Sequence, residues 1–204
     1  MIWGLVLAGG RSTRMGRDKA TLVVGGNGER LVDRVVAAAT GALRAAGERA
    51  PRVLVSGAVE GHECVLDATA GLGPVAGIAA ALDLALGGRA RPTHLLALPV
   101  DLPNVTAGAL APIVARTGAP AAHYVETVLP ALLRVDEPTR AVVREVLAAE
   151  GRERSVTQLL ARLGAEAIPL DPAHARALAN VNTPEELRDA LSTSAPRTAG
   201  GGRT

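Results

Sequence analysis

The chain has 204 residues, 48% of them hydrophobic but only 1% aromatic, and a formal net charge of +2. This length suits one α/β domain, and the scarcity of aromatic rings argues against proteins that stack nucleic-acid bases on such rings. The arginines are scattered without a basic run, which argues against a DNA-wrapping protein. The single cysteine, Cys64, rules out a disulfide within the chain and suits a reducing compartment. The sequence shows neither a basic leader nor a stretch near the ~20 apolar residues of a membrane span, so we expect a cytoplasmic protein.

The first half of the chain alternates short apolar runs with helical patterns. An apolar run at 2–7 predicts a buried strand that ends in a turn at Ala8-Gly9-Gly10. Apolar residues then recur at helical spacing from Glu29 to Arg49 and predict a helix. Further elements are expected as strands at 52–56, 64–66 and 94–98, an alanine-rich helix from Gly73 to about Leu86, and a helix capped by Thr106 that runs to about Arg116.

The second half of the chain changes character, because two predicted strands follow one another without a helix between them. The expected elements are strands at 121–125 and 128–135, helices at 136–149 and 155–163, a strand at 165–170 and a helix at 184–191. The alternation predicts an α/β fold with a mostly parallel sheet, a small antiparallel part and helices on both faces. We expect one domain over 1–191 and a disordered tail over 192–204, where Ser, Thr, Ala, Pro, Arg and Gly dominate.

Lys19 is the single lysine of a chain that holds 22 lysine and arginine residues in total. It follows a glycine-rich turn whose backbone could cradle phosphate oxygens, and Arg11 and Arg14 add positive charge there. A lysine is a compact point charge that suits an oligophosphate, whereas arginine is a planar fork. The glycine spacing matches neither the P-loop nor the dinucleotide fingerprint. Taken alone, this segment is interpreted equally well as an ordinary polar loop.

Asp101 is the second candidate, because it follows a strongly apolar strand and stands between Pro99 and Pro103. A carboxylate in this position can hold Mg²⁺ while phosphates supply other ligands. An aspartate that caps the next helix is the alternative. Its place in Pro-x-Asp-x-Pro, away from the helix start, makes that alternative weaker.

Two further segments carry weaker signals. Asp67 with the glycine-bounded turn at 73–77 could receive a flat ring, although a plain loop before a helix is the better interpretation by itself. Thr183 and Glu186 form a capping box before the last helix. This leaves Asn180 and Asn182, which would point the same way in an extended segment and could hydrogen-bond a ligand.

These motifs together resemble the molybdenum cofactor guanylyltransferase family, in order from residue 5 to about 190. The resemblance implies a three-layer α/β/α, Rossmann-like nucleotidyltransferase fold. It also implies that GMP passes from GTP to the terminal phosphate of molybdopterin or Mo-molybdopterin, that pyrophosphate leaves and that Mg²⁺ is the cofactor. A monomer or weak homo-oligomer is expected, with neither nucleic acid nor membrane as a partner.

The resemblance assigns roles by position. The catalytic residues would be Lys19, Asp101 and Arg14, with Asp101 as the metal ligand. Asn180 and Asn182 would bind the acceptor. The residues expected to bind GTP are Leu7, Ala8, Gly9, Gly10, Lys19, Ser56, Asp67, Gly73, Pro74, Gly77 and Asp101.

The chain departs from the family pattern at two positions. Ser56 stands where members often carry Asn, and Asn104 stands where they often carry a bulky aromatic residue. One alternative is a CTP- or GTP-dependent nucleotidyltransferase that acts on another phosphorylated acceptor. A second alternative is a nucleotide-binding relative without catalysis, against which the retention of both Lys19 and Asp101 speaks.

Overall fold

The computed structural model describes residues 1–8, 19–25, 28–66 and 71–192. Within them one seven-stranded sheet has the order β3-β2-β1-β4-β6-β5-β7. The strands are β1 (Ile2–Leu7), β2 (Arg52–Ser56), β3 (Cys64–Val65), β4 (His94–Pro99), β5 (Ala121–Tyr124), β6 (Ala131–Arg134) and β7 (Glu166–Ile168).

The pairing of the strands confirms the mostly parallel sheet with a small antiparallel part. β1 is parallel to both β2 and β4, and β3 extends this parallel set beyond β2. β6 runs antiparallel to both of its neighbours, β4 and β5, and β7 is parallel to β5. In register, Leu7 pairs with Ser56 on one side and with Pro99 on the other. The chain therefore leaves β1, β2 and β4 at one carboxyl edge of the sheet, where α/β proteins bind their ligands.

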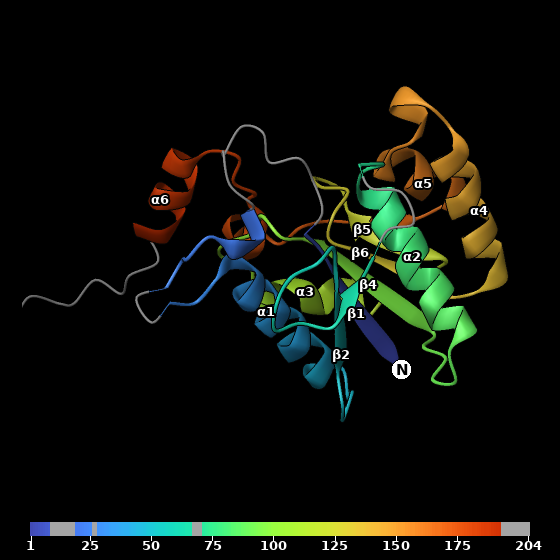
Figure 1. Ribbon diagram of the computed structural model, residues 1–204, viewed down its shortest axis with the longest axis horizontal. Helices are drawn as coiled ribbons and strands as arrows, with labels where there is room; N and C mark the ends of the chain where they lie inside the picture. The colour runs from blue at the N-terminus through green and yellow to red at the C-terminus, as the bar shows by residue number, and fades with distance from the viewer. Residues whose placement is uncertain (9–18, 26–27, 67–70, 193–204) are drawn as a thin grey trace, which may run out of the picture.

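Helices cover both faces of the sheet, which confirms the three-layer arrangement (Figure 1). α1 (Leu31–Ala45) and α3 (Ala107–Val114) pack on one face. α2 (Pro74–Gly87), α4 (Glu137–Ala148) and α5 (Val156–Leu163) pack on the other. α6 (Pro184–Ser192) follows the last segment of the chain that returns to the carboxyl edge.

β1 shows why the sequence predicted a buried strand. All six of its residues are buried, because the strand lies in the middle of the sheet with helices on each side. Successive side chains alternate between the two layers, so that Val6 enters the core under α1 and α3 while Leu5 and Leu7 enter the core under α2. An apolar run with no polar face is thus the expected sequence of this position.

Local capping signals place the helix starts. The side chain of Thr106 accepts a hydrogen bond from Ala109 N at 3.2 Å, and Ser155 accepts one from Gln158 N at 3.2 Å. Before α6, Thr183 Oγ1 accepts from Glu186 N at 3.1 Å. The Glu186 carboxylate accepts from the backbone of Asn182 at 2.6 Å, one residue earlier than in a full capping box.

The structure differs from the expected elements in several places. The predicted strand at 128–135 is only Ala131–Arg134, because Pro130 has no N–H with which to extend the ladder. The strand expected at 165–170 is Glu166–Ile168, and a 3₁₀ helix that was not expected spans Pro172–Leu178. α1 is shorter at both ends than the predicted helix. At its start, the Asp33 carboxylate accepts a hydrogen bond from the backbone N of Arg30, the N-cap residue. Beyond its end, the chain turns at Gly47, which has φ +95°.

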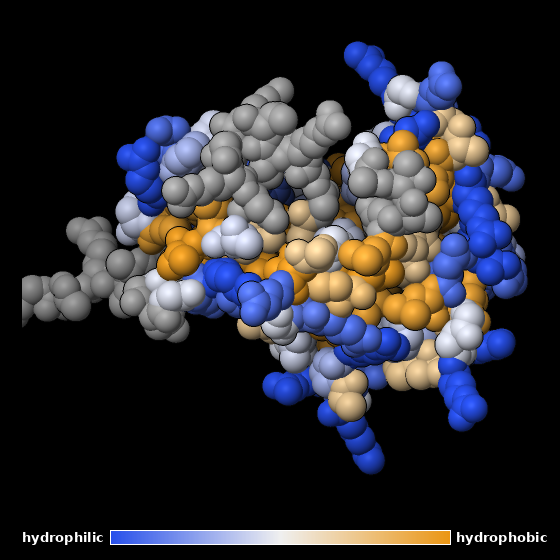
Figure 2. Space-filling model, in the orientation of Figure 1, coloured by the Kyte–Doolittle hydropathy of each residue, from blue (hydrophilic) through white to orange (hydrophobic). Residues whose placement is uncertain are grey.

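The outer face of the α2, α4 and α5 layer carries hydrophilic side chains. Figure 2 shows hydrophilic side chains along the edge of the molecule formed by α4. Arg140 and Arg144 on that helix both reach Asp83 of α2, at 3.8 and 2.9 Å. Within the described ranges, no helix combines the length and apolar character needed to cross a membrane.

Candidate active site

Lys19 and Asp101 meet at the carboxyl edge of the sheet. The Lys19 Nζ lies 3.3 Å from Asp101 Oδ2, and the two side chains are 15% and 19% exposed. Lys19 begins a short 3₁₀ helix at Lys19–Thr21, and Asp101 follows β4 by two residues. An ion pair that is shielded from water in this way keeps more of its Coulomb energy than a surface pair does.

Two more acceptors surround the Lys19 ammonium. It donates to the carbonyl oxygen of Val181 at 2.8 Å and to Asn182 Oδ1 at 3.2 Å. An ammonium has three N–H groups, and the three acceptors match that number. The segment that holds Asn182 is itself pinned to the site, because Val181 N donates to the backbone carbonyl of Asp101 at 2.9 Å.

Asp101 also has an oxygen that the described residues leave unpaired. Its Oδ1 is buried, and within the described part of the chain no hydrogen-bond donor reaches it. A buried carboxylate oxygen without a partner costs free energy, and a hard cation such as Mg²⁺ is a ligand that would remove this cost. No group of three or more His, Cys, Asp or Glu residues suited to a metal occurs among the described residues. A metal at Asp101 would therefore take its remaining ligands from elsewhere, as Mg²⁺ does when it binds phosphates and water.

Backbone and arginine contacts hold the Asp101 loop in place. Val100 N donates to the carbonyl of Leu7 at 3.2 Å, which joins this loop to the end of β1. Arg34 of α1 donates to the carbonyl of Pro103 at 3.2 Å and to Glu29 Oε2 at 2.7 Å. Sequence reasoning missed Arg34, because nothing in its neighbourhood separates it from the other arginines of an arginine-rich chain.

The start of α2 packs tightly on the ends of β1 and β2. A Cβ placed on Gly77 would lie 2.9 Å from Leu7 Cδ2 and 3.0 Å from Ser56 Cβ, so only glycine lets the helix approach this closely. Ser56 is 2% exposed and lies in this contact. The structure thus gives Ser56 and Gly77 a packing role, and their contact with GTP stays a prediction.

The turn before α2 has one side that no described residue covers. Gly73 adopts φ +79° at the N-cap position, Pro74 follows as the first helical residue, and among the described residues no atom lies within 4 Å of a Cβ placed on Gly73. A positive φ explains the glycine, and no described residue covers this side of its backbone. Ala8 is half-buried, whereas Gly9, Gly10, Arg14 and Asp67 lie outside the described residues.

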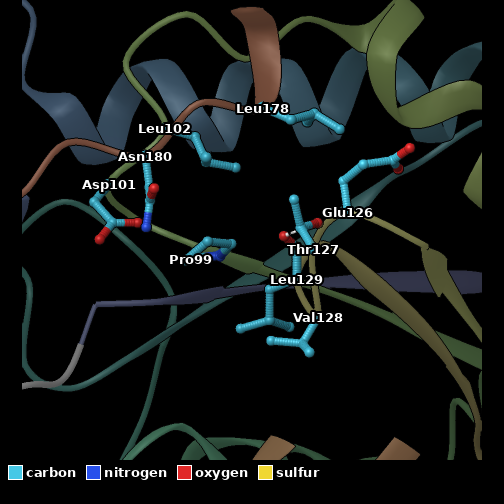
Figure 3. A pocket seen from close by; sticks show the side chains of 9 residues that line it. All are labelled: Pro99, Asp101, Leu102, Glu126, Thr127, Val128, Leu129, Leu178 and Asn180. Carbon is cyan, nitrogen blue, oxygen red and sulfur yellow. Dashed lines mark hydrogen bonds between the residues drawn. The ribbon is translucent and has the colours of Figure 1, made fainter. Parts of the chain in front are cut away.

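A hollow of about 440 Å³ lies on the other side of Asp101, between its loop and the connection from β5 to β6 (Figure 3). Asp101 and Asn180 occupy one end, and Glu126 and Thr127 come from the β5–β6 connection opposite. The lining residues are Pro99, Asp101, Leu102, Glu126, Thr127, Val128, Leu129, Leu178 and Asn180. Sequence reasoning named no candidate site residue in the β5–β6 connection.

The two asparagines have different neighbours. Asn180 lines the hollow beside Asp101, whereas Asn182 accepts a hydrogen bond from Lys19. Both residues are exposed. The structure thus gives the two amides different neighbours, and acceptor binding by Asn180 and Asn182 stays a prediction.

A second polar cluster stiffens the neighbouring loop after β2. The Arg30 guanidinium hydrogen-bonds the Asp33 carboxylate at 2.7 Å and holds the pKa of Asp33 well below its usual range. His62 Nε2 lies 2.8 Å from the same carboxylate, and Arg30 also donates to the carbonyl of Glu60 at 3.0 Å. The cluster ties residues 60–62 to the start of α1.

The three-layer α/β/α sheet, which holds a lysine and an aspartate face to face at its carboxyl edge, is the fold of a class that includes solved nucleotidyltransferases. Solved structures share this fold. A nucleotidyl transferase from Methanothermobacter thermautotroptrophicus (Mth528) superposes with a TM-score of 0.65 at 18% identity, over 96% of this chain and 99% of that one. The 2-C-methyl-D-erythritol 4-phosphate cytidylyltransferase from Thermus thermophilus gives 0.60 at 19% identity, over 93% and 96%.

Sequence comparison narrows the class to a family. The model of the MobA-like NTP transferase domain matches residues 4–168, and the chain belongs to this family. The molybdenum cofactor guanylyltransferase of Xanthomonas euvesicatoria pv. vesicatoria (strain 85-10) is 33% identical over 183 residues, 90% of each chain. That of Rhizobium meliloti (strain 1021) is 32% identical over 91% of this chain and 88% of its own. The resemblance that the motifs indicated is confirmed.

Proposed function

We propose that this protein transfers GMP from GTP to the phosphate of molybdopterin or Mo-molybdopterin, giving molybdopterin guanine dinucleotide and pyrophosphate. The observation that carries the proposal is the Lys19–Asp101 pair, 3.3 Å apart at the carboxyl edge. Two relatives that match about nine-tenths of this chain are named molybdenum cofactor guanylyltransferases. Their names support the choice of substrates. A function that depends on GTP is also our reason for proposing a cytoplasmic location.

In the proposed reaction, an oxygen of the acceptor phosphate attacks the α-phosphorus of GTP. The bond from the α-phosphorus to the bridging oxygen breaks, and that oxygen leaves with the electron pair on pyrophosphate. Such a transfer needs positioning and charge neutralisation more than a covalent partner. Lys19 would bind the phosphate oxygens of GTP as a compact cation, and Arg14 would add a second positive charge.

We propose Asp101 as the residue that holds Mg²⁺, through the buried Oδ1 that lacks a partner among the described residues. When bound, Mg²⁺ neutralises negative charge on the phosphates and fixes their orientation. Asp101 is suited to this role because its loop is held on both sides, by Leu7 through Val100 and by Arg34 through Pro103. A fixed carboxylate needs no rearrangement before it binds a cation.

The order of the strands supports separate binding sites for the donor, GTP, and for the acceptor. The turn at Gly73 and the contact of α2 with Leu7 and Ser56 lie on the β1–β2 side of Asp101. The 440 Å³ hollow lies on the β6–β5 side. We therefore propose that GTP binds on the first side and the acceptor on the second, with Asn180 among the acceptor contacts. The volume falls within the ~300–1,000 Å³ range of small-molecule sites.

A panel of nucleotides with a pyrophosphate-release readout tests this function. With molybdopterin and Mg²⁺ present, GTP should support release and yield a product whose mass is that of the guanine dinucleotide, whereas ATP, UTP and CTP should not. A protein that consumes CTP and ignores GTP would sink the guanylyl assignment. Turnover of GTP with a different phosphorylated acceptor, and not with molybdopterin, would contradict the proposed acceptor but leave GTP as the donor.

A further inference from the structure

The ammonium of Lys19 is held by three acceptors from two segments of the chain. Asp101 supplies a charged oxygen at 3.3 Å, Val181 a backbone carbonyl at 2.8 Å and Asn182 a neutral amide oxygen at 3.2 Å. Asn182 thus orients the positive charge without cancelling it, because an amide carries no net charge. A carboxylate in the same place would bring a second negative charge to the lysine.

Asn182 is itself fixed from both sides. Its backbone N donates to Glu186 Oε2 at 2.6 Å, and the preceding N–H, that of Val181, donates to the Asp101 carbonyl at 2.9 Å. The side chains of Val181 and Leu187 are buried and anchor this segment to the body of the protein. The amide oxygen therefore reaches Lys19 from a rigid support, which is what a positioning group requires.

Asn180 offers a natural comparison two residues earlier. It lines the hollow with Asp101, and among the described residues Lys19 is hydrogen-bonded to Asn182 and not to Asn180. The two amides are alike in chemistry and exposure but face different partners. A ligand in the hollow would meet Asn180 first, whereas a phosphate oxygen that binds Lys19 would share the ammonium with Asn182.

We propose that Asn182 is a positioning residue for Lys19 and acts on the donor side of the reaction. It holds the ammonium beside Asp101, so that the lysine presents its charge to the triphosphate in one orientation. The kinetic part of this inference rests on the proposed function, since the nucleotide is taken to be GTP. The structural part does not, since it concerns only how Asn182 holds Lys19.

The single lysine of the chain makes a direct test possible. Protein grown with ¹³C,¹⁵N-labelled lysine should give one set of side-chain NMR signals, that of Lys19. In Asn182→Ala the Lys19 signal should shift and broaden in the free protein. Affinity for GTP with Mg²⁺, measured without an acceptor, should fall about fivefold to tenfold, as expected for loss of one charge-assisted hydrogen bond at an exposed site.

Asn180→Ala is the matched control. It should leave the Lys19 signal and the GTP affinity unchanged, and raise the KM for molybdopterin instead. Glu186→Ala removes the support of the Asn182 backbone without touching Lys19, so it should move the Lys19 signal in the same direction as Asn182→Ala. Thermal unfolding of each variant shows whether the fold is kept.

An unchanged Lys19 signal and GTP affinity in Asn182→Ala, together with a raised KM for molybdopterin, would overturn the proposal and make Asn182 an acceptor ligand. The proposed function fails separately, when the wild-type protein forms no guanine dinucleotide. In that case the Lys19 signals of the three variants still decide whether Asn182 positions the lysine.

Discussion

Lys19 and Asp101 are 82 positions apart in the sequence, yet the ammonium and the carboxylate lie within 3.3 Å of one another. The pair joins a segment that follows β1 to a loop that follows β4, and these strands are neighbours in the sheet. The two carboxylate oxygens of Asp101 have different surroundings. One faces Lys19, and the other is buried without a partner among the described residues.

Lys19→Arg tests whether the shape of the cation matters as well as its charge. We expect kcat/KM for GTP to fall by about tenfold or more, because a planar guanidinium cannot place its donors on the three acceptors that surround the ammonium. Pyrophosphate release at varied GTP concentration measures the loss. Wild-type kinetics in this variant would show that any positive charge suffices.

Asp101→Asn keeps the size of the side chain and removes its charge. We expect turnover that depends on Mg²⁺ to fall by about a hundredfold or more, with thermal stability kept, since a neutral amide is a much poorer ligand for Mg²⁺. Asp83→Asn is the control, because Asp83 pairs only with α4 arginines among the described residues and lies away from the site. Equal losses in both variants would contradict a special role for Asp101.

Gly77→Ala tests the close contact between α2 and the ends of β1 and β2. A new Cβ would lie 2.9 Å from Leu7 and 3.0 Å from Ser56, so we expect the free energy of unfolding to fall by about 1–3 kcal/mol. Gly87→Ala at the end of the same helix meets no atom within 4 Å among the described residues, and should be neutral or stabilise by up to ~1 kcal/mol. Chemical denaturation of the two variants compares them directly. If Gly77→Ala is as stable as Gly87→Ala, the contact is not tight.

His94 gives the protein a stability that depends on pH. Burial of its ring, with a smaller effect of the Arg134 charge, lowers the pKa of His94 below its ordinary value of 6.5. The unfolded chain therefore binds a proton more readily than the folded one, and the stability that neutral His94 provides is complete above pH 6.5 and is lost as the pH falls through the folded pKa. We expect the free energy of unfolding to decrease from pH 7.5 to pH 5.5.

His94→Gln isolates this contribution, because glutamine does not titrate. Its free energy of unfolding should change less with pH over the same interval than that of the wild-type protein. Denaturation curves at several pH values measure both slopes. Identical slopes would assign the pH dependence to other groups.

Local signals account for the parts of the fold that were predicted correctly. The unbroken apolar run of β1 indicates a strand covered on both faces, and it is such a strand. Thr106 and Ser155 mark helix starts because their hydroxyls cap the backbone within three residues. The local signal misleads at Pro130, where the missing N–H makes the β6 ladder shorter than the apolar pattern suggests.

The residues of the candidate site also fall into those that the sequence predicted and those that it did not. Motifs named Lys19, Asp101 and Asn180 because each residue type has a recognisable chemistry in its own segment. Arg34 could not be named, since its value lies in reaching Pro103, which is 69 residues away. Gly77 was named for a ligand contact, but the structure shows that it also makes room for Leu7 and Ser56.

The sequence by itself determined most of the elements, their order and the candidate residues for phosphate chemistry, because these depend on interactions between near neighbours in the chain. Only the tertiary structure decided which of those residues share a site. The sheet order brings the carboxyl ends of β1 and β4 together, and the return of the chain at Val181 brings Asn182 to Lys19 and leaves Asn180 beside the hollow. Contacts across 82 or 162 residues are set by packing of the whole domain, and no local pattern encodes them.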